Sequence, residues 1–457
     1  MHKKFIMIEK YEYPKVLVVD ALPFSWTTNG GIVKSNLFKG WPADRLVQID
    51  YSNTKPEFDV CSNYWMLKKW NILKGLIGDA SCAELSKESY NHTPLDEKEM
   101  TYESRHSIER KLSVLPLKLR LLIGESVFRL PSLLSKSLRR WIDDFQPDVI
   151  FTTLGLPTIL RTVVKVSQYK NIPIVPYFTD DWINTLYKDD AIFRLWHRRN
   201  MLYWFKECLH RSPISMTICD AMNDEYTKRY GGHFESFMTL VDFKNTPLVD
   251  NKTITISVVR LTFIGSLDPN RWQCLRAIGE ALLDLRGKGI EAELLIYTFP
   301  DHIEKYCEML TIEPVMKVMG TATYDQVEKL QKESDVLVHV ESFENSVREY
   351  TKFSVSTKIT QYMMSDTCVF AYGPGEVASL RFLSDSNAGV TVGEENPELL
   401  RAVLSRLITD PAFRQSTVGR AKEIVLEKNE SSRQRNRFKE LIIDSCNEWQ
   451  ASNNSKI

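Results

Sequence analysis

Several loops in this 457-residue chain place glycine, hydroxyl or charged side chains directly after an apolar run. The first of these loops carries Asn29, Gly30 and Gly31. Paired glycines let backbone N–H groups approach a ligand closely, and a helix start favours negative charge. A tight turn without any ligand explains the same glycine pair. Both interpretations of this loop stay open at the level of the sequence.

Two adjacent carboxylates, Asp180 and Asp181, follow the apolar run at 173–178. Either carboxylate can orient a substrate hydroxyl or act as a general base. Alternatively, one of them only caps the next helix, a position at which Asp is favoured. The pair is therefore a candidate reacting centre or a candidate helix cap.

Two further loops combine small or hydroxyl residues with a positive charge. Gly265 and Ser266 are followed by Arg271, and Ser356 is followed by Lys358 just before an expected helix. Gly265 permits close approach to a phosphate, and Arg271 can clamp a phosphate through two N–H groups. Hydroxyls at a helix start bind phosphate oxygens or cap the helix, and a lysine adds charge. These residues predict an anion site.

Absent motifs narrow the chemistry further. The chain has no G-x-x-x-x-G-K-[ST] and no G-x-G-x-x-G pattern, which argues against a P-loop nucleotide hydrolase and a typical dinucleotide-binding dehydrogenase. It has no D-x-D pair, no H-E-x-x-H, and dispersed cysteines and histidines, so we expect no metal site. The chemistry that these exclusions leave is anion binding by backbone N–H groups, hydroxyls and Lys or Arg side chains.

Composition and charge set the class of protein. The chain is 43% hydrophobic and 26% charged, which is typical of a folded soluble protein and excludes a largely disordered one. Its 59 Lys and Arg balance 59 Asp and Glu, so no nucleic-acid partner is expected. The apolar run near the start is too short for a signal peptide, and no stretch approaches eighteen apolar residues. We therefore expect a cytoplasmic protein.

The elements that must position these loops follow from alternating patterns. Apolar runs separated by helix-compatible stretches are the signature of βαβ units, and ligands bind beyond the carboxyl ends of their strands. The pattern predicts an α/β fold with an N-terminal domain over 1–245 and a C-terminal domain over 255–430. We expect 431–457 to form a helix that packs back on the N-terminal domain. The predicted strands lie at 16–20, 46–49, 148–153, 173–178, 214–218, 261–265, 292–297, 314–318, 335–340, 367–372 and 388–392.

Residues 84–141 do not fit this rhythm, and we expect them to form a helical insertion in the N-terminal domain. Within it, 102–140 holds nine Lys or Arg and three Glu among apolar residues. A basic amphipathic helix of this kind can lie on an anionic membrane surface. An ordinary surface helix with a solvated face explains the pattern equally well.

Together these residues resemble the GT-B glycosyltransferases of family 4, and they are most similar to bacterial enzymes that build capsular, exo- or lipopolysaccharide. The resemblance covers most of both domains and is weakest over 84–141. It is carried by Gly30-Gly31-Ile32, Asp180-Asp181-Trp182, Met222 to Gly232, Phe263 to Leu267, Ser334 to Leu337 and Phe353 to Tyr372.

The resemblance implies two Rossmann-like domains facing across a cleft, with the donor nucleoside diphosphate sugar held by the C-terminal domain and the acceptor by the N-terminal one. It implies no cofactor and no metal, because Arg and Lys stabilise the departing diphosphate, and the anomeric configuration is usually retained. By resemblance, Lys358 and Arg271 contact the diphosphate above Gly265 and Ser266, and Ser356 belongs to the same donor segment.

Two departures from the family pattern stand out. Where the family often has two glutamates eight positions apart, this chain has Phe353 and Gln361. Gln361 can still hydrogen-bond ribose hydroxyls, and Glu341 or Glu344 can substitute for the first glutamate. The family's His-Asp pair reads Thr179-Asp180 here. These changes leave room for a catalytically silent member.

The sequence therefore predicts a cytoplasmic, metal-independent glycosyltransferase that acts on a saccharide or lipid-linked saccharide at the inner membrane face. The alternatives are a catalytically inactive GT-B protein that binds a nucleotide sugar or partners another transferase, and a nucleotide-sugar 2-epimerase with the same fold.

Overall fold

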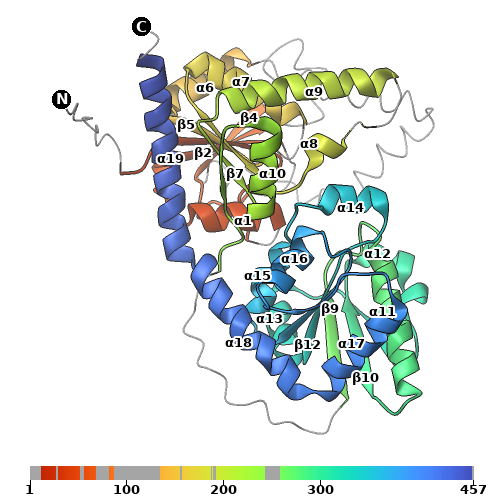
Figure 1. The fold of residues 1–457 in the computed structure, drawn as a ribbon. Coiled ribbons are helices and arrows are strands. Elements are labelled where there is room, and N and C mark those ends of the chain that lie inside the picture. The colour runs from red at the N-terminus through yellow and green to blue at the C-terminus, as the bar shows by residue number, and fades with distance from the viewer. Residues whose placement is uncertain are drawn as a thin grey trace, which may run out of the picture.

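The chain folds around two β-sheets, the first mostly parallel and the second wholly parallel, which belong to two α/β units (Figure 1). The strand order is β4-β3-β2-β1-β5-β6-β7-β8 in the first sheet and β11-β10-β9-β12-β13-β14 in the second. The computed structural model describes residues 12–26, 29–51, 56–67, 82–86, 134–154, 157–186, 188, 192–241 and 258–454.

The first sheet is parallel except where β3 meets β4. Every residue of β1 and β2 is buried, as continuous apolar runs predict for strands covered on both faces. Its strands are β1 (Val16–Asp20), β2 (Leu46–Asp50), β3 (Asn63–Leu67), β4 (Cys82–Ser86), β5 (Val149–Thr152), β6 (Ile174–Phe178), β7 (Ile214–Thr217) and β8 (His233–Ser236). Its helices are α1 (Asn29–Phe38), α6 (Lys136–Phe145), α7 (Pro157–Lys170), α8 (Trp182–Thr185), α9 (Ile192–His210) and α10 (Asp220–Tyr230).

One boundary of the predicted helical insertion is wrong. Residues 84–86 belong to β4, whose Leu85 and Glu84 pair with Tyr64 and Trp65 of β3 in antiparallel register. Ala83 and Leu85 flank Glu84, a period-two pattern that suits a strand better than a helix. Most of the segment, at 87–133, lies outside the described residues, and α6 occupies its C-terminal end.

The second sheet is parallel throughout its pairings. Its strands are β9 (Val259–Ile264), β10 (Ala292–Tyr297), β11 (Met316–Gly320), β12 (Val336–Val340), β13 (Cys368–Tyr372) and β14 (Val390–Val392). Its helices are α11 (Arg271–Arg286), α12 (Pro300–Tyr306), α13 (Tyr324–Glu333), α14 (Asn345–Thr351), α15 (Thr357–Met363), α16 (Ala378–Asp385), α17 (Pro397–Thr409) and α18 (Pro411–Lys428). Each predicted strand run overlaps one of the observed strands.

The last helix, α19 (Ser431–Asn454), leaves the second unit and runs along the first (Figure 1). It contacts α1, β5 and β6, and Phe438 packs edge to face on Phe38 and Phe151. Where α18 ends, Asn429 donates from Nδ2 to the Thr239 carbonyl at 3.1 Å. The helix is therefore part of the first unit's core.

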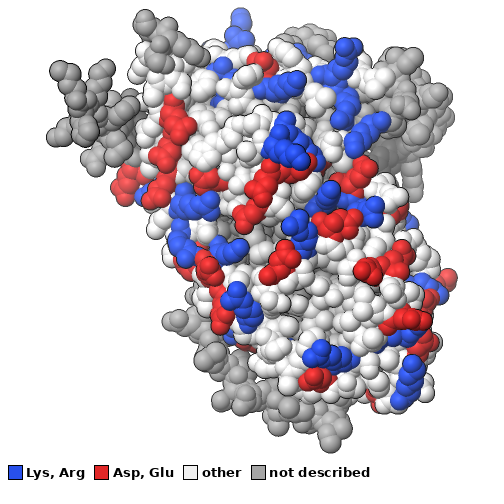
Figure 2. Space-filling view, in the orientation of Figure 1, with Lys and Arg blue, Asp and Glu red and all other residues white. Residues whose placement is uncertain are grey.

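The two units share apolar contact at their junction. Phe353, Val355 and Ile359 of the second unit belong to the same buried cluster as the first unit's core. Helix α8 also contacts α14 across this junction. Acidic and basic side chains are interspersed over the face seen in Figure 2. Within the described part of the chain, no helix is both long and apolar enough to cross a membrane.

Candidate functional site

A lysine lies directly over the carboxyl end of the central strand of the second sheet. Gly265 follows β9 with φ +151°, a conformation that L side chains rarely adopt. A Cβ built on Gly265 would lie 1.5 Å from Lys358 Nζ, in the first turn of α15. Only glycine at position 265 therefore leaves room for the ammonium group.

Among the residues that the structure describes, none is a counter-ion to this ammonium group. Lys358 Nζ lies 5.6 Å from the Phe263 ring centroid, and no hydrogen bond or ion pair joins it to another described residue. Burial lowers the pKa of Lys358 from 10.5 to about 7; Arg271 acts in the same direction and Glu341 opposes it. A buried, unpaired cation of this kind is poised to bind an anion.

Arg271, at the start of α11, is already engaged with protein groups. Its Nη2 lies 3.2 and 3.0 Å from the two Glu341 oxygens, while Nε donates to the Val340 carbonyl at 3.1 Å. Its Nη1 donates to the Asp268 carbonyl at 2.8 Å. These bonds use four of the five guanidinium N–H groups. The predicted two-donor clamp on a phosphate is therefore not available in this arrangement.

Glu341 is the buried partner that holds Arg271, and its side chain is 3% exposed. Burial raises the pKa of Glu341, but Arg271 and His339, whose Nε2 lies 3.1 Å from Oε1, outweigh it and lower the pKa to about 2. The carboxylate stays ionised and fixes the guanidinium beside Lys358. Arg271 and Glu341 thus shape the electrostatic surroundings of the lysine.

Asp180 follows β6 by two residues and lies in the first unit, within the electrostatic influence of Glu341 and Arg271. Its Oδ1 accepts a hydrogen bond from Ser354 Oγ of the second unit at 2.8 Å, and Oδ2 accepts one from Thr179 Oγ1 at 3.2 Å. Burial raises the pKa of Asp180, the two hydroxyls oppose it, and Glu341 raises it further. Asp180 is therefore the carboxylate that lies at the junction.

Asp181 turns instead into the first unit. Its side chain is 1% exposed, and it accepts from Tyr226 Oη at 3.1 Å and from Arg229 Nη1 at 2.8 Å. Asp181 occupies the N-cap position of α8, but its side chain makes no capping hydrogen bond. The geometry separates the two carboxylates: Asp180 is available to a ligand, and Asp181 is a structural partner of Arg229.

The other donor-side residues lie around the same strand ends. Ser266 Oγ accepts from the Asp268 N–H at 3.1 Å within the loop after β9. Glu344 accepts from Asn270 Nδ2 of that loop and from Ser346 Oγ at 2.7 Å, and these bonds lower its pKa. The site therefore joins the loop after β9 to the loop before α14.

Two candidates lie on or beside α15, the helix of Lys358. Ser356 stands at the N-cap position of α15 without a side-chain cap, and its N–H donates to Ser379 Oγ at 3.1 Å. Gln361 is partly buried, and its side chain has no hydrogen bond to the described part of the protein. Both side chains are therefore free to meet a ligand near Lys358.

The glycine pair opens α1, which begins at Asn29 immediately after the first loop. Because β1, β5 and β6 are parallel neighbours, this helix start lies at the same sheet edge as Asp180. Below it, Lys34 is fully buried and pairs with Asp20 Oδ2 at 3.0 Å. The sequence pattern did not predict this ion pair, which fixes the end of β1.

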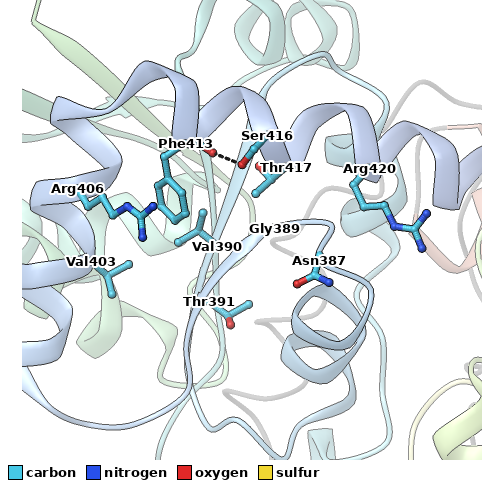
Figure 3. A pocket seen from close by; sticks show the side chains of 10 residues that line it. All are labelled: Asn387, Gly389, Val390, Thr391, Val403, Arg406, Phe413, Ser416, Thr417 and Arg420. Atoms are coloured by element: carbon cyan, nitrogen blue, oxygen red, sulfur yellow. Dashed lines mark hydrogen bonds between the residues drawn. The ribbon is translucent and has the colours of Figure 1, made fainter.

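A cavity of about 390 Å³ lies elsewhere, at the amino end of β14 (Figure 3). Arg406 stacks on Phe413 at 4.0 Å, and Arg420 pairs with Glu423 at 3.0 Å. The side chains of Arg406 and Arg420 are 64% and 46% exposed, and no predicted site residue lines the cavity. The opposite, carboxyl edge of the sheet carries the candidate site. Among the described residues, no group of three His, Cys, Asp or Glu side chains is arranged to hold a metal ion.

The fold of the chain is similar to that of several solved structures. No protein-family model matches the chain, and no curated protein matches its sequence. Anabaena Alr3699/HepE in complex with UDP superimposes with a TM-score of 0.59 at 9% identity, over 94% of this chain and 100% of that one. Sucrose-phosphate synthase from Thermosynechococcus elongatus gives a TM-score of 0.59 at 13% identity, over 94% and 98% of the two chains. Trehalose-6-phosphate synthase OtsA gives 0.58 at 10% identity, over 95% and 99%.

These structures are GT-B proteins, and the chain adopts the GT-B fold. The expected α/β fold of two Rossmann-like units that face each other is therefore confirmed. At these identities the likeness establishes the architecture alone.

Proposed function

We propose that the protein is a glycosyltransferase that uses a nucleoside diphosphate sugar as co-substrate. The single observation that carries this proposal is the buried Lys358 ammonium over Gly265, which has no ion-pair partner among the described residues. When a glycosidic bond to a diphosphate breaks, negative charge develops on the leaving phosphate, and a fixed cation stabilises it. Lys358 takes that role, with Ser266 and Ser356 as hydroxyl donors.

Two exposed apolar side chains offer a binding surface for the nucleoside end of the donor. Phe299 follows β10 and is 48% exposed, and Met319 in neighbouring β11 is 49% exposed. Both lie toward the carboxyl edge that carries Gly265, where a flat base can stack on them. We assign ribose and sugar contacts to Gln361 and Glu344. The HepE structures similar in fold contain UDP and, in one case, UDP-glucose.

Asp180 is our candidate for the contact at the reacting centre, on the acceptor side of the junction. Its carboxylate already accepts from Ser354 across the two units, so an acceptor hydroxyl can take the place of that serine. The helix start at Asn29, Gly30 and Gly31 belongs to the same edge and is proposed to meet the acceptor.

On the basis of the resemblance to family 4, we also propose the stereochemistry, the metal independence and the acceptor class of the reaction. The reaction retains the anomeric configuration, needs no metal, and transfers the sugar to a saccharide or lipid-linked saccharide in surface polysaccharide synthesis. The absence of D-x-D and the lysine over Gly265 support the metal-independent mechanism.

Phe353 favours a second candidate, a catalytically inactive GT-B protein that binds a nucleotide sugar or a partner. Phe353 stands where the family often has a donor-binding glutamate. Here it is 8% exposed, its ring lies 5.3 Å from Arg229 Cζ, and its carbonyl accepts from Cys219 Sγ at 3.2 Å. The side chain thus packs between the two units and offers no polar group to a sugar.

A thermal-stability panel tests the proposal. UDP, GDP, dTDP and CDP, with their common sugar conjugates, are added to the parent protein and to Lys358→Ala, with Lys329→Ala on exposed α13 as the matched control. A ligand at a hundred times its Kd stabilises the folded state by about 2.7 kcal/mol. We expect one nucleotide class to raise the melting temperature of the parent and of Lys329→Ala only. A flat panel contradicts the proposal, whereas binding without sugar transfer or donor hydrolysis supports the silent alternative.

We also propose that the protein associates peripherally with the cytoplasmic face of an anionic membrane through 102–140. Residues 102–133 lie outside the described residues, but Lys136, Arg139 and Arg140 of α6 are exposed. Anionic liposomes at low salt should sediment the protein, because electrostatic attraction is strongest there. Equal recovery with neutral and anionic liposomes contradicts this part of the proposal.

A further inference from the structure

One buried histidine holds the loop on which the proposed diphosphate rests. His302, in α12, is 6% exposed. Its Nδ1 accepts a hydrogen bond from the Leu267 backbone N–H at 3.2 Å, and its Nε2 lies 3.0 Å from Asp268 Oδ2. Leu267 and Asp268 directly follow Ser266 in the loop that leads to Arg271, so one side chain restrains this loop at two consecutive positions.

The contacts define the tautomer of this histidine. A backbone N–H can only donate, so Nδ1 must carry a lone pair toward Leu267. The ring proton of the neutral imidazole therefore resides on Nε2 and points to the Asp268 carboxylate. His302 thus acts as an acceptor on one side and a donor on the other, a combination that no apolar side chain of similar size provides.

His302 also contacts the segment that follows β10. Its Nδ1 lies 3.2 Å from Thr298 Oγ1, and its ring meets the Phe299 ring edge to face at 5.7 Å. Phe299 is the exposed aromatic that we assign to the nucleobase. One ring therefore links the loop beneath the diphosphate to the surface proposed for the base.

We propose that His302 is a positioning residue for donor binding, which sets the relative placement of the diphosphate loop and the base surface through Leu267, Asp268 and Phe299. It touches no reacting atom in this account and acts through the loop residues. The inference rests on the proposed function, because it assumes that a nucleotide binds beside Gly265.

Two variants at position 302 separate positioning from packing. His302→Phe keeps an aromatic ring but removes both hydrogen bonds. His302→Gln restores an amide oxygen for the Leu267 N–H and an amide N–H for Asp268. His197→Phe, at a buried histidine of α9 in the other unit, is the matched control for loss of a buried imidazole. For each protein, calorimetric titration with the best-binding nucleoside diphosphate gives Kd, and thermal unfolding gives stability.

We expect His302→Phe to raise Kd about tenfold, since a buried N–H loses its acceptor and the loop loses its restraint. His302→Gln should recover most of the affinity, and His197→Phe should bind like the parent. If His302→Phe is less stable but binds with the parent's Kd, the positioning role is refuted while the proposed function stands. If the parent binds no nucleoside diphosphate, the proposed function itself fails.

Discussion

Replacing Lys358 by methionine should make the free protein more stable while removing its ability to bind a nucleotide. The lysine lies in the site with its pKa lowered from 10.5 to about 7, chiefly by burial. At 1.36 kcal/mol for each pH unit, that interval means that the buried charge lowers the free energy of unfolding by about 5 kcal/mol at low pH. Methionine has a similar length and no charge, so it removes this cost.

The sign of the pH dependence follows from proton linkage. Below pH 7 the lysine is charged in both the folded and the unfolded chain, and the full cost of about 5 kcal/mol is present. Between about pH 7 and 10.5 the unfolded chain binds more protons than the folded one, so the parent becomes more stable relative to Lys358→Met as pH rises. At pH 9 about 2 kcal/mol of the difference remains.

Thermal unfolding of the parent, Lys358→Met and the exposed control Lys329→Met at pH 6.5 and pH 9 measures this difference. We expect Lys358→Met to have a higher melting temperature than the parent, and the difference to be larger at pH 6.5 than at pH 9. Nucleotides should not change the melting temperature of Lys358→Met. A Lys358→Met protein that melts below the parent, or a gap that does not change with pH, refutes the reasoning from a buried uncompensated charge.

Three further predictions concern the neighbouring groups. Asp180→Asn should lower the rate of sugar transfer at least about a hundredfold with little loss of stability. Asp181→Asn should instead destabilise the fold by about 3 kcal/mol, because it breaks the buried pair with Arg229. Activity and unfolding measurements that rank the two variants alike contradict this assignment. Gly265→Ala should weaken nucleotide binding at least about tenfold, because its Cβ would overlap Lys358 Nζ, and calorimetric titration with unchanged Kd would exclude the proposed position of the ligand. Glu341, with its pKa lowered from 4.5 to about 2, contributes about 3 kcal/mol that is present above pH 4.5 and lost as pH falls toward 2; Glu341→Gln should therefore flatten the acid limb of the stability profile.

The strands of both sheets were predictable because most are buried on both faces and therefore read as short apolar runs. β1 and β12 are examples in which every residue is buried. The strands that the sequence analysis missed are β3, β4 and β8. β8 is partly exposed at the edge of its sheet, and its polar residues hide the pattern. β4 has only a short alternating pattern, and it pairs with β3 in antiparallel register rather than through a βαβ unit.

The site was predictable in its residue types but not in its pairings. The sequence places Arg271 in a phosphate loop, but its partner Glu341 lies seventy residues away and reaches it only through the adjacency of β9 and β12. Similarly, nothing in the pair Asp180-Asp181 indicates which carboxylate faces the junction. That choice depends on Arg229 and Ser354, which approach from other elements.

The central claim, that a nucleoside diphosphate binds against Lys358, is tested most directly by counting protons. Titration calorimetry at pH 8 in buffers of different ionisation enthalpy measures proton uptake on binding. With a pKa of about 7, Lys358 is about nine-tenths neutral at pH 8, so a bound diphosphate should draw in about 0.9 proton per site. We expect this uptake with the parent and with Lys329→Ala, and none with Lys358→Ala. Tight binding without proton uptake, or uptake that persists in Lys358→Ala, would contradict the account.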